Sequence, residues 1–385
     1  MARRLQLDHR GIEVLQNELE GLLVISLEQA VAAPYCGLLL ADAGARVIKV
    51  ERPEGDFARQ YDDGVNGESA IFAWLNRGKE SIALNLKNAE DLSVMKAMLR
   101  KADVFVSNLA TGRVAEMGLS GQTLRIENPK LITCTISGYG ETGAGAQKKA
   151  YDFLVQGEVG LCSVTGSRDT PARVGISVTD LSTGLTAFSG ILRALIQQGK
   201  SGIGSDVTVS MFDVMADWMN MPLMAHRYMG GAPERSGLQH SFIAPYGAFD
   251  CKEGKQILLS VQNNREWVSF CNHVLEKPSL ATDPRFANNP SRFENRDVLD
   301  QIVSDCFETL EIDVISSRLD RAGIANGALN TVADLSEHIC LKNARASIGA
   351  AEVTMAALPL SLNNETGIVP ALGQHSVPLR KEFAL

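Results

Sequence analysis

The sequence is poor in residues that build metal and redox sites. Only six histidines occur in 385 residues, and the seven cysteines are an odd number without a CxxC pair. No two cysteines or histidines have the spacing of zinc ligands, so we expect no metal site. Most cysteines lie in apolar runs such as ITCTIS, where a reduced core thiol is the ordinary interpretation.

Positive charge and long apolar runs are also scarce. The formal net charge is −8, whereas a nucleic-acid-binding domain usually carries a basic stripe. No apolar run approaches the roughly 20 residues of a membrane helix. The opening MARRLQLDHRGIEVLQNELEG lacks the apolar segment of a signal peptide and is typical of a short amphipathic helix. We therefore expect a cytoplasmic protein that binds neither nucleic acid nor membrane.

Strand-like and helix-like segments alternate along the first half of the chain. This alternation predicts a parallel, doubly wound α/β sheet, whose ligands bind beyond the carboxyl ends of the strands. Helices are expected over 34–43, 89–101 and 181–198. Strands are expected at 22–27, 45–51, 81–86, 102–108, 130–137 and 206–210.

A second, smaller α/β domain is expected after a Met-rich helix over 211–229, whose methionines indicate a core or a subunit interface. The linker GGAPERSG leads into this domain, which has strands at 246–251 and 256–261 and helices between 264 and 322. The predicted division is a large domain at 1–225, a small domain at 226–330, and a segment at 331–385 that returns to the large domain.

Two familiar motifs are absent or incomplete. GYGETG, at 138–143, matches G-x-G-x-x-G, but the loop-like AGAQKKAYDF follows it instead of an apolar helix, so a nicotinamide site is not expected. No G-x-S-x-G elbow occurs, and only His240 and His375 lie in loops rich in glycine or serine. A hydrolase therefore lacks support.

Two acids lie among small residues instead. Asp152 in AYDFLVQG begins a predicted helix, where capping is the ordinary role. Asp180 in VGISVTDLSTGL permits two interpretations: a helix cap that accepts from the backbone of Ser182 or Thr183, or a nucleophile. The two are compatible, since cap hydrogen bonds keep a carboxylate ionised and nucleophilic acyl transfer needs an ionised carboxylate.

Several segments, taken in order, resemble one family. EQAVAAPYCGLLLADAGARVIKVERPEGDFAR, LNRGKESIALNLKN, KADVFVSNLATGRVAEMGLS, TISGYGETG, AYDFLVQGEVGLCSVTG, VGISVTDLSTGL, QHSFIAPYGAF, VQNNREW and LGQHS resemble segments of the family III CoA-transferases, the formyl-CoA/carnitine CoA-transferase group. The resemblance extends from about Gly21 to the end of the chain. No single motif is diagnostic, but their combination is highly specific.

The resemblance places the family's nucleophilic aspartate at Asp180. It implies that Asp180 attacks an acyl-CoA thioester, forming a mixed anhydride and then an aspartyl-CoA thioester, from which an acceptor carboxylate takes the CoA. No metal or redox cofactor takes part, and CoA or acyl-CoA is a substrate. The small residues Ser182, Thr183 and Gly184 would keep the carboxylate open.

The resemblance also implies a set of CoA-binding residues. Gln29 to Ala32 would lie along the pantetheine arm of CoA. The alternative is that these residues only form an ordinary turn between a strand and a helix. Arg52 would contact the adenosine phosphates or remain solvated, and Lys149 to Asp152 would lie near the thioester. The implied residues are Gln29, Ala30, Val31, Ala32, Arg52, Leu84, Asn85, Leu86, Lys87, Asn108, Leu109, Ala110, Met117, Lys149, Ala150, Tyr151 and Asp152.

The sequence departs from the family pattern at two places. Glu116 stands where an arginine often faces the CoA phosphates, and Arg113 or Lys79 would have to compensate. The glycine-rich loop of the oxalate-linked members is replaced by QHSFIAPYGAF, which disfavours formyl or oxalyl substrates. We expect a short dicarboxylic acid acceptor and succinyl-CoA as donor. The candidates to hold the distal carboxylate are Arg173, Arg227, Arg235 and His240.

The alternative within the same fold family is a 2-methylacyl-CoA racemase, which needs bases around the α-carbon. Those enzymes carry a histidine just before the aspartate that corresponds to Asp152, whereas this chain has Tyr151, a poor base near neutral pH. The family further implies an interlocked homodimer of two ring-shaped chains.

Overall fold

The computed structural model describes residues 17–360 and 367–384. The predicted N-terminal helix, with His9, lies largely outside these residues. The chain divides into two compact units. Unit 1 comprises Met1–Gly160, Val174–Asn220 and Lys342–Leu385, and unit 2 comprises Leu161–Arg173 and Met221–Leu341. Within the described residues, no helix is both long and apolar enough to span a membrane.

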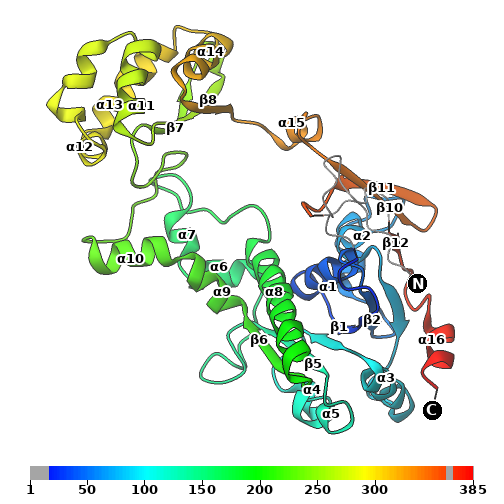
Figure 1. Cartoon of the computed structure of the whole chain (residues 1–385). Coiled ribbons are helices and arrows are strands. Elements are labelled where there is room, and N and C mark those ends of the chain that lie inside the picture. The colour runs from blue at the N-terminus through cyan, green and yellow to red at the C-terminus, as the bar shows by residue number, and fades with distance from the viewer. Residues whose placement is uncertain (1–16, 361–366, 385) are drawn as a thin grey trace. The chain divides into compact units, whose positions relative to one another are not determined.

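Unit 1 is built on a six-stranded sheet in the order β3-β2-β1-β4-β5-β6, with every neighbouring pair parallel (Figure 1). This confirms the predicted parallel α/β sheet. The order reverses between β1 and β4, and open α/β sheets bind ligands beyond the strand ends at such a point. The strands are β1 (Leu23–Leu27), β2 (Arg46–Glu51), β3 (Glu80–Ala83), β4 (Val104–Ser107), β5 (Ile132–Ser137) and β6 (Asp206–Ser210).

Helices cover both faces of this sheet. One face packs against α1 and α8 through a core that contains Val24, Leu40 and Ile191, and the other packs against α3 and α16 through Ile25, Met98 and Leu379. Strands buried on both faces are expected to be continuously apolar, as VFVS and RVIKV nearly are. The helices of unit 1 are α1 (Ala32–Asp42), α2 (Ala70–Asn76), α3 (Ala89–Lys101), α4 (Arg113–Glu116), α5 (Gly121–Glu127), α6 (Asp152–Glu158), α8 (Val178–Ser201), α9 (Met211–Trp218) and α16 (Ser376–Glu382).

The Met-rich segment forms two helices instead of the single predicted one. α9 ends at Trp218, and α10 (Asn220–Tyr228) follows after Met219. Met215 on α9 is buried in the core, whereas Met221 on α10 is 57% exposed. The methionines therefore do not form one continuous buried stripe.

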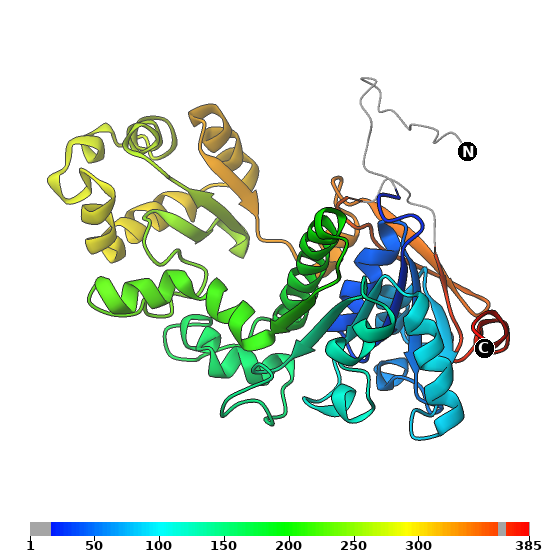
Figure 2. The same cartoon turned by 60° about the horizontal axis from the view of Figure 1, so that its bottom comes forward.

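The C-terminal segment returns to unit 1 and includes elements that the sequence did not reveal. β10 (Asn343–Ile348) and β11 (Ala351–Ala356) form an antiparallel hairpin, and β12 (Ile368–Val369) pairs in parallel with β10. His375 then docks on the sheet edge, because its N–H donates to the Ser81 carbonyl and its Nδ1 accepts the Ser81 N–H. In Figure 2 the red helix α16 lies beside this blue edge of the sheet.

Unit 2 is an antiparallel sheet, β7-β8-β9, packed against helices. Its core centres on Trp267, Phe270 and Phe307, which lie on different helical segments. The predicted strands β7 and β8 are present, and β9 is an addition. The elements are α7 (Leu161–Val164), β7 (Tyr246–Asp250), β8 (Gln256–Ser260), α11 (Asn264–Ser269), α12 (Asn289–Glu294), α13 (Arg296–Phe307), α14 (Ile312–Ala322), β9 (Ala325–Ala328) and α15 (Val332–Ser336).

Candidate active site

Asp180 lies inside the first turn of α8, not at its cap. The helix starts at Val178, three residues before the predicted start, so the prediction that Asp180 caps Ser182 or Thr183 is wrong. Asp152 takes the capping role from another helix: the Thr179 N–H donates to its Oδ1 over 2.8 Å. A carboxylate at this position accepts one of the free N–H groups at the start of the helix, and its negative charge interacts favourably with the positive end of the helix dipole.

The Asp180 carboxylate has an unusual electrostatic environment. It is partly buried, and its side chain forms no hydrogen bond with any residue in the described parts of the chain. Burial is the main cause that raises the pKa of Asp180 from 3.8 to about 7, and the nearby negative charge of Asp152 adds to it. The expectation that cap hydrogen bonds hold this carboxylate ionised is therefore also wrong. Near neutral pH it exchanges between acid and nucleophilic carboxylate.

The small residues after Asp180 are buried and serve packing. Ser182 Oγ and Thr183 Oγ1 both donate to the Thr179 carbonyl of their own helix, over 3.1 and 2.6 Å. A Cβ added to Gly184 would lie 2.5 Å from the Ala32 carbonyl oxygen. Glycine thus lets α8 approach the turn at Gln29–Ala32 closely, one helical turn after Asp180.

The turn at Gln29–Ala32 lies at the point where the strand order reverses. Asn108, directly after β4, accepts the Gln29 N–H at its Oδ1 (3.0 Å) and donates from its Nδ2 to the Gln29 carbonyl (2.8 Å). The Ala30 N–H donates to Asp56 Oδ1 over 3.2 Å. The structure therefore brings together two of the predicted CoA-binding segments, 29–32 and 108–110, at the predicted edge of the sheet.

The side chains of the remaining predicted CoA-binding residues differ in their solvent exposure. Arg52 is exposed, and its Nε donates to the Gly55 carbonyl over 2.8 Å. Leu84 is 2% exposed and belongs to the core, so only its backbone can reach a ligand. Leu86, Leu109 and Met117 are partly buried against that core. Exposed side chains among the predicted contacts are those of Asn85, Lys87, Ala110, Lys149 and Tyr151.

Neither candidate to replace the missing phosphate-binding arginine is free to do so. Lys79 is completely buried, and its Nζ donates to Glu28 Oε1 (2.5 Å), so it cannot reach a phosphate and that expectation is wrong. Arg113 is exposed but pairs with Glu116 over 2.8 Å. The acid at position 116 therefore also forms an ion pair with the exposed Arg113.

Tyr61 is a site residue that the sequence did not indicate. Partial burial and the negative charges of Asp56 and Asp180 raise the pKa of Tyr61 to about 12. Tyr151 also contributes to this shift, so the two phenols and the Asp180 carboxylate share one neighbourhood. Tyr61 lies in a loop after a 3-10 turn, Phe57–Gln60. No periodicity or motif marks such a position.

Two of the candidates to bind the distal carboxylate, Arg235 and His240, already form hydrogen bonds with other residues of unit 2. Arg235 donates to the carbonyls of Ser163, Ser167 and Arg168, which occupies most of its guanidinium. His240 accepts two backbone N–H groups at Nδ1, and its ring stacks on Tyr246 at 4.8 Å. Burial, with the charge of Arg296, lowers the pKa of His240 below its usual value.

Arg173 and Arg227 are both exposed.

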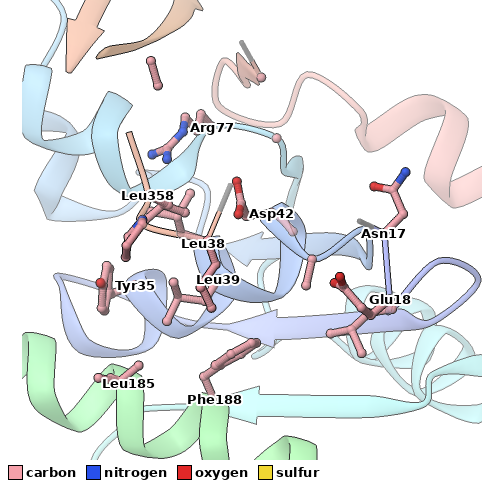
Figure 3. Close-up of a pocket in the computed structure, with 18 of the residues that line it drawn as sticks. Asn17, Glu18, Tyr35, Leu38, Leu39, Asp42, Arg77, Leu185, Phe188 and Leu358 are labelled. Carbon is pink, nitrogen blue, oxygen red and sulfur yellow. The ribbon is translucent and has the colours of Figure 1, made fainter. Parts of the chain in front are cut away.

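The cavity of Figure 3, about 540 Å³, is separate from the predicted site. α1 contributes Tyr35, Leu38 and Leu39, and α8 contributes Leu185 and Phe188 (Figure 3). None of the predicted catalytic or CoA-binding residues lines it. Its volume falls in the range of small-ligand pockets, and its mostly apolar lining includes the polar side chains of Glu18, Asp42 and Arg77.

Comparison with known proteins gives consistent results. The chain matches CoA-transferase family III over residues 19–376. It is 35% identical over 373 residues to acetyl-CoA:oxalate CoA-transferase of Acetobacter aceti, with 95% of each chain covered. It is 37% identical over 302 residues to succinate–glutarate CoA-transferase of Agrobacterium fabrum, covering 76% of this chain and 74% of the relative. Identity to succinyl-CoA:glutarate CoA-transferase of Mus musculus is 33% over 378 residues, covering 94% and 86%.

Solved structures agree with this assignment. A CAIB/BAIF family protein from Brucella suis superposes with a TM-score of 0.81 at 30% identity, covering 95% of this chain and 99% of that one. A hypothetical protein from Mycobacterium tuberculosis superposes with a TM-score of 0.83 at 25% identity, covering 95% and 100%.

Proposed function

Since the chain belongs to CoA-transferase family III and is therefore a CoA-transferase, we propose that it moves CoA from succinyl-CoA to a short dicarboxylic acid. Relatives named for glutarate support a dicarboxylate acceptor. Oxalate should also be tested as an acceptor, because one relative is named for it. The loop QHSFIAPYGAF argues against oxalate as the acceptor. The racemase alternative is not favoured, because the named relatives are CoA-transferases.

The environment of Asp180 is the observation that supports the proposed mechanism, in which its carboxylate is the nucleophile. Its carboxylate oxygen attacks the thioester carbon, the C–S bond breaks, and CoA leaves as the thiolate. The thiolate attacks the Asp180 carbonyl of the mixed anhydride, which releases the donor acid and leaves an aspartyl-CoA thioester. The acceptor carboxylate then reverses these two steps and departs as its CoA ester. A carboxylate without hydrogen bonds is a stronger nucleophile than a capped one, because no donor holds its charge.

The proposed CoA site comprises the turn 29–32, the segment 108–110, Arg52, the backbone of 84–87, Met117 and the segment 149–152. These residues follow the carboxyl ends of β1 to β4 or precede α6, as expected for ligands of a doubly wound sheet. The reaction needs acyl-CoA and a carboxylic acid and no tightly bound cofactor. We further propose a cytoplasmic location.

We also propose that the protein is an interlocked homodimer. Apolar side chains exposed around α15 support this, among them Val332 at 83% and Ile339 at 97% exposure. Exposed apolar surface of this kind is typical of subunit contacts. Mass photometry at nanomolar protein should show dimers, and dilution alone should release no folded monomer. Monomers with wild-type activity would refute the interlocked assembly.

Peptide mass spectrometry tests the nucleophile. After incubation with succinyl-CoA and a hydroxylamine quench, we expect a hydroxamate on the peptide that carries Asp180, absent without acyl-CoA and absent in Asp180→Asn. Failure to find it, together with solvent deuterium entering the α-position of a branched acyl-CoA, would indicate a racemase instead. For the acceptor, a Michaelis constant for succinate no lower than that for acetate would exclude dicarboxylate specificity.

A further inference from the structure

Four charged side chains are completely buried beside the turn at Gln29–Ala32. Glu28 follows β1, Lys49 lies on β2, Asp56 precedes the 3-10 turn, and Lys79 precedes β3. The side chain of each is 0% exposed. Charged side chains are almost never buried unless they are paired, so their arrangement requires an explanation.

The four side chains form one connected chain of ion pairs. Lys79 Nζ donates to Glu28 Oε1 over 2.5 Å, and Lys49 Nζ lies 3.3 Å from the same oxygen. Lys49 Nζ also donates to Asp56 Oδ2 over 2.9 Å. The two lysines hold the pKa of Glu28 below its usual value despite its burial. Each carboxylate therefore has a cation, and each lysine has a carboxylate.

This chain of ion pairs ends on the backbone of the turn. Asp56 Oδ1 accepts the Ala30 N–H over 3.2 Å, while Lys49 holds the other oxygen of the same carboxylate. Ala30 has a φ of +63°, a conformation that is unfavourable for any residue with a Cβ. Asn108 binds both polar groups of Gln29 on the other side. The turn is thus held from two directions in a conformation that it would not adopt alone.

Stability alone is a poor explanation for such a network. Buried ion pairs are often no more stabilising than apolar side chains of the same volume. Strained backbone persists where the surrounding structure enforces it, and it gathers at functional sites. The Ala32 carbonyl of this turn, moreover, is the atom against which Gly184 of α8 packs, one helical turn after Asp180.

We propose that Asp56 is a positioning residue, oriented by Lys49 and Glu28, which fixes the turn at Gln29–Ala32 in the shape that receives acyl-CoA beside Asp180. The inference rests on the proposed function and goes beyond it. Asp56 acts through the Ala30 backbone and does not touch the substrate. Its role is to select one conformation of the turn.

The test compares Asp56→Ala with a rescuing double variant. Asp56→Ala removes the acceptor of the Ala30 N–H. We expect the Kd of CoA, measured by titration calorimetry, and the KM for succinyl-CoA each to rise about tenfold. Adding Ala30→Gly should recover most of this loss, because glycine adopts a positive φ without support. Ala30→Gly alone provides the baseline against which this recovery is measured.

Asp103→Ala is the matched control. Asp103 Oδ2 also accepts a backbone N–H, that of Leu23 over 2.8 Å, but at the end of β1 opposite to the turn. Its loss should leave KM and CoA affinity unchanged. If Asp56→Ala does not fold, Ala30→Val carries the test: it leaves the buried charges intact, disfavours the positive φ, and should raise KM.

The outcomes separate this inference from the proposed function. A wild type that binds no CoA would overturn both. A wild type that binds CoA, with an Asp56→Ala variant of equal affinity, would overturn the positioning role alone. A loss that Ala30→Gly does not relieve, or one that Asp103→Ala shares, would show a general structural effect and would also overturn the inference.

Discussion

Replacing Asp180 by asparagine should stabilise the protein while it abolishes transfer. Burial and the charge of Asp152 raise the pKa of Asp180 from 3.8 to about 7. Between these two pH values the folded chain retains a proton that the unfolded chain has lost. The wild type is therefore destabilised progressively as pH rises through this window. Asparagine has nearly the same shape and never ionises, so the variant escapes this loss.

The magnitude follows from the two pKa values. One pKa unit corresponds to about 1.4 kcal/mol. Relative to a side chain that stays neutral, the raised pKa of Asp180 destabilises the fold by about 2 kcal/mol at pH 5 and about 4 kcal/mol at pH 8. The stabilisation by Asp180→Asn should thus grow by about 2–3 kcal/mol between these pH values.

Urea unfolding of wild type and variant at pH 5 and pH 8 measures this difference. The contributions of the other titrating groups to the free energy of unfolding are the same in both proteins and therefore cancel. Asp62→Asn is the control: hydrogen bonds lower the pKa of Asp62 to about 2, so both pH values lie above its titration and its effect should not change between them. An Asp180→Asn variant that is stabilised equally at both pH values, or at neither, would refute the raised pKa.

Three further predictions concern the neighbours of Asp180. Asp152→Asn should move the acid limb of the kcat profile to lower pH without restoring a pKa of 3.8, because burial is the larger cause of the shift; an unmoved limb would contradict the assigned charge. Tyr61→Phe should lower kcat about tenfold or more while CoA affinity stays near wild type, since its hydroxyl can donate to the oxyanion formed at Asp180; an unchanged kcat would exclude this role. Gly184→Ala should cost about 1–3 kcal/mol of stability and most activity, because its Cβ meets a backbone oxygen at 2.5 Å. Gly199→Ala in the same helix meets no atom within 4 Å and should instead add about 0.5–1 kcal/mol in urea unfolding; equal effects would show that the close contact does not matter.

The sheet of unit 1 could be predicted because its signal is local. Each strand is a short apolar run, each is followed by a helix or a turn, and only a parallel sheet covered on both faces accommodates that order. β9, β10 and β11 escaped prediction for a physical reason. ANGA, NARASI and AEVTMA carry few β-branched residues. In addition, β9 pairs with β8, which is distant in sequence.

The candidate site was predictable only in part. The position of Asp180 came from family resemblance, and the role that local pattern suggested for it was wrong, because α8 begins earlier and Asp152 caps it from 27 positions away. Tyr61 and the pairing of Lys49 with Asp56 give no sequence signal. Both arise from contacts between loops and strand ends, which composition and periodicity do not encode.

The contrast between Asp152 and Asp180 explains how one small region can hold two carboxylates in different roles. Asp152 receives the Thr179 N–H and the Gln156 amide, so donors compensate its charge. Asp180 lies in the same helical turn as Thr179, receives no such donor among the described residues, and faces the charge of Asp152. Hydrogen bonds would ionise Asp180 fully but would also hold the electron pair that must attack the thioester. A pKa near 7 leaves about half of the molecules ionised at neutral pH, and in those molecules the carboxylate is unencumbered. A substitution that donates one hydrogen bond to Asp180 should therefore lower its pKa and slow acylation at pH values where the carboxylate is fully ionised, whereas faster acylation there would contradict this reasoning.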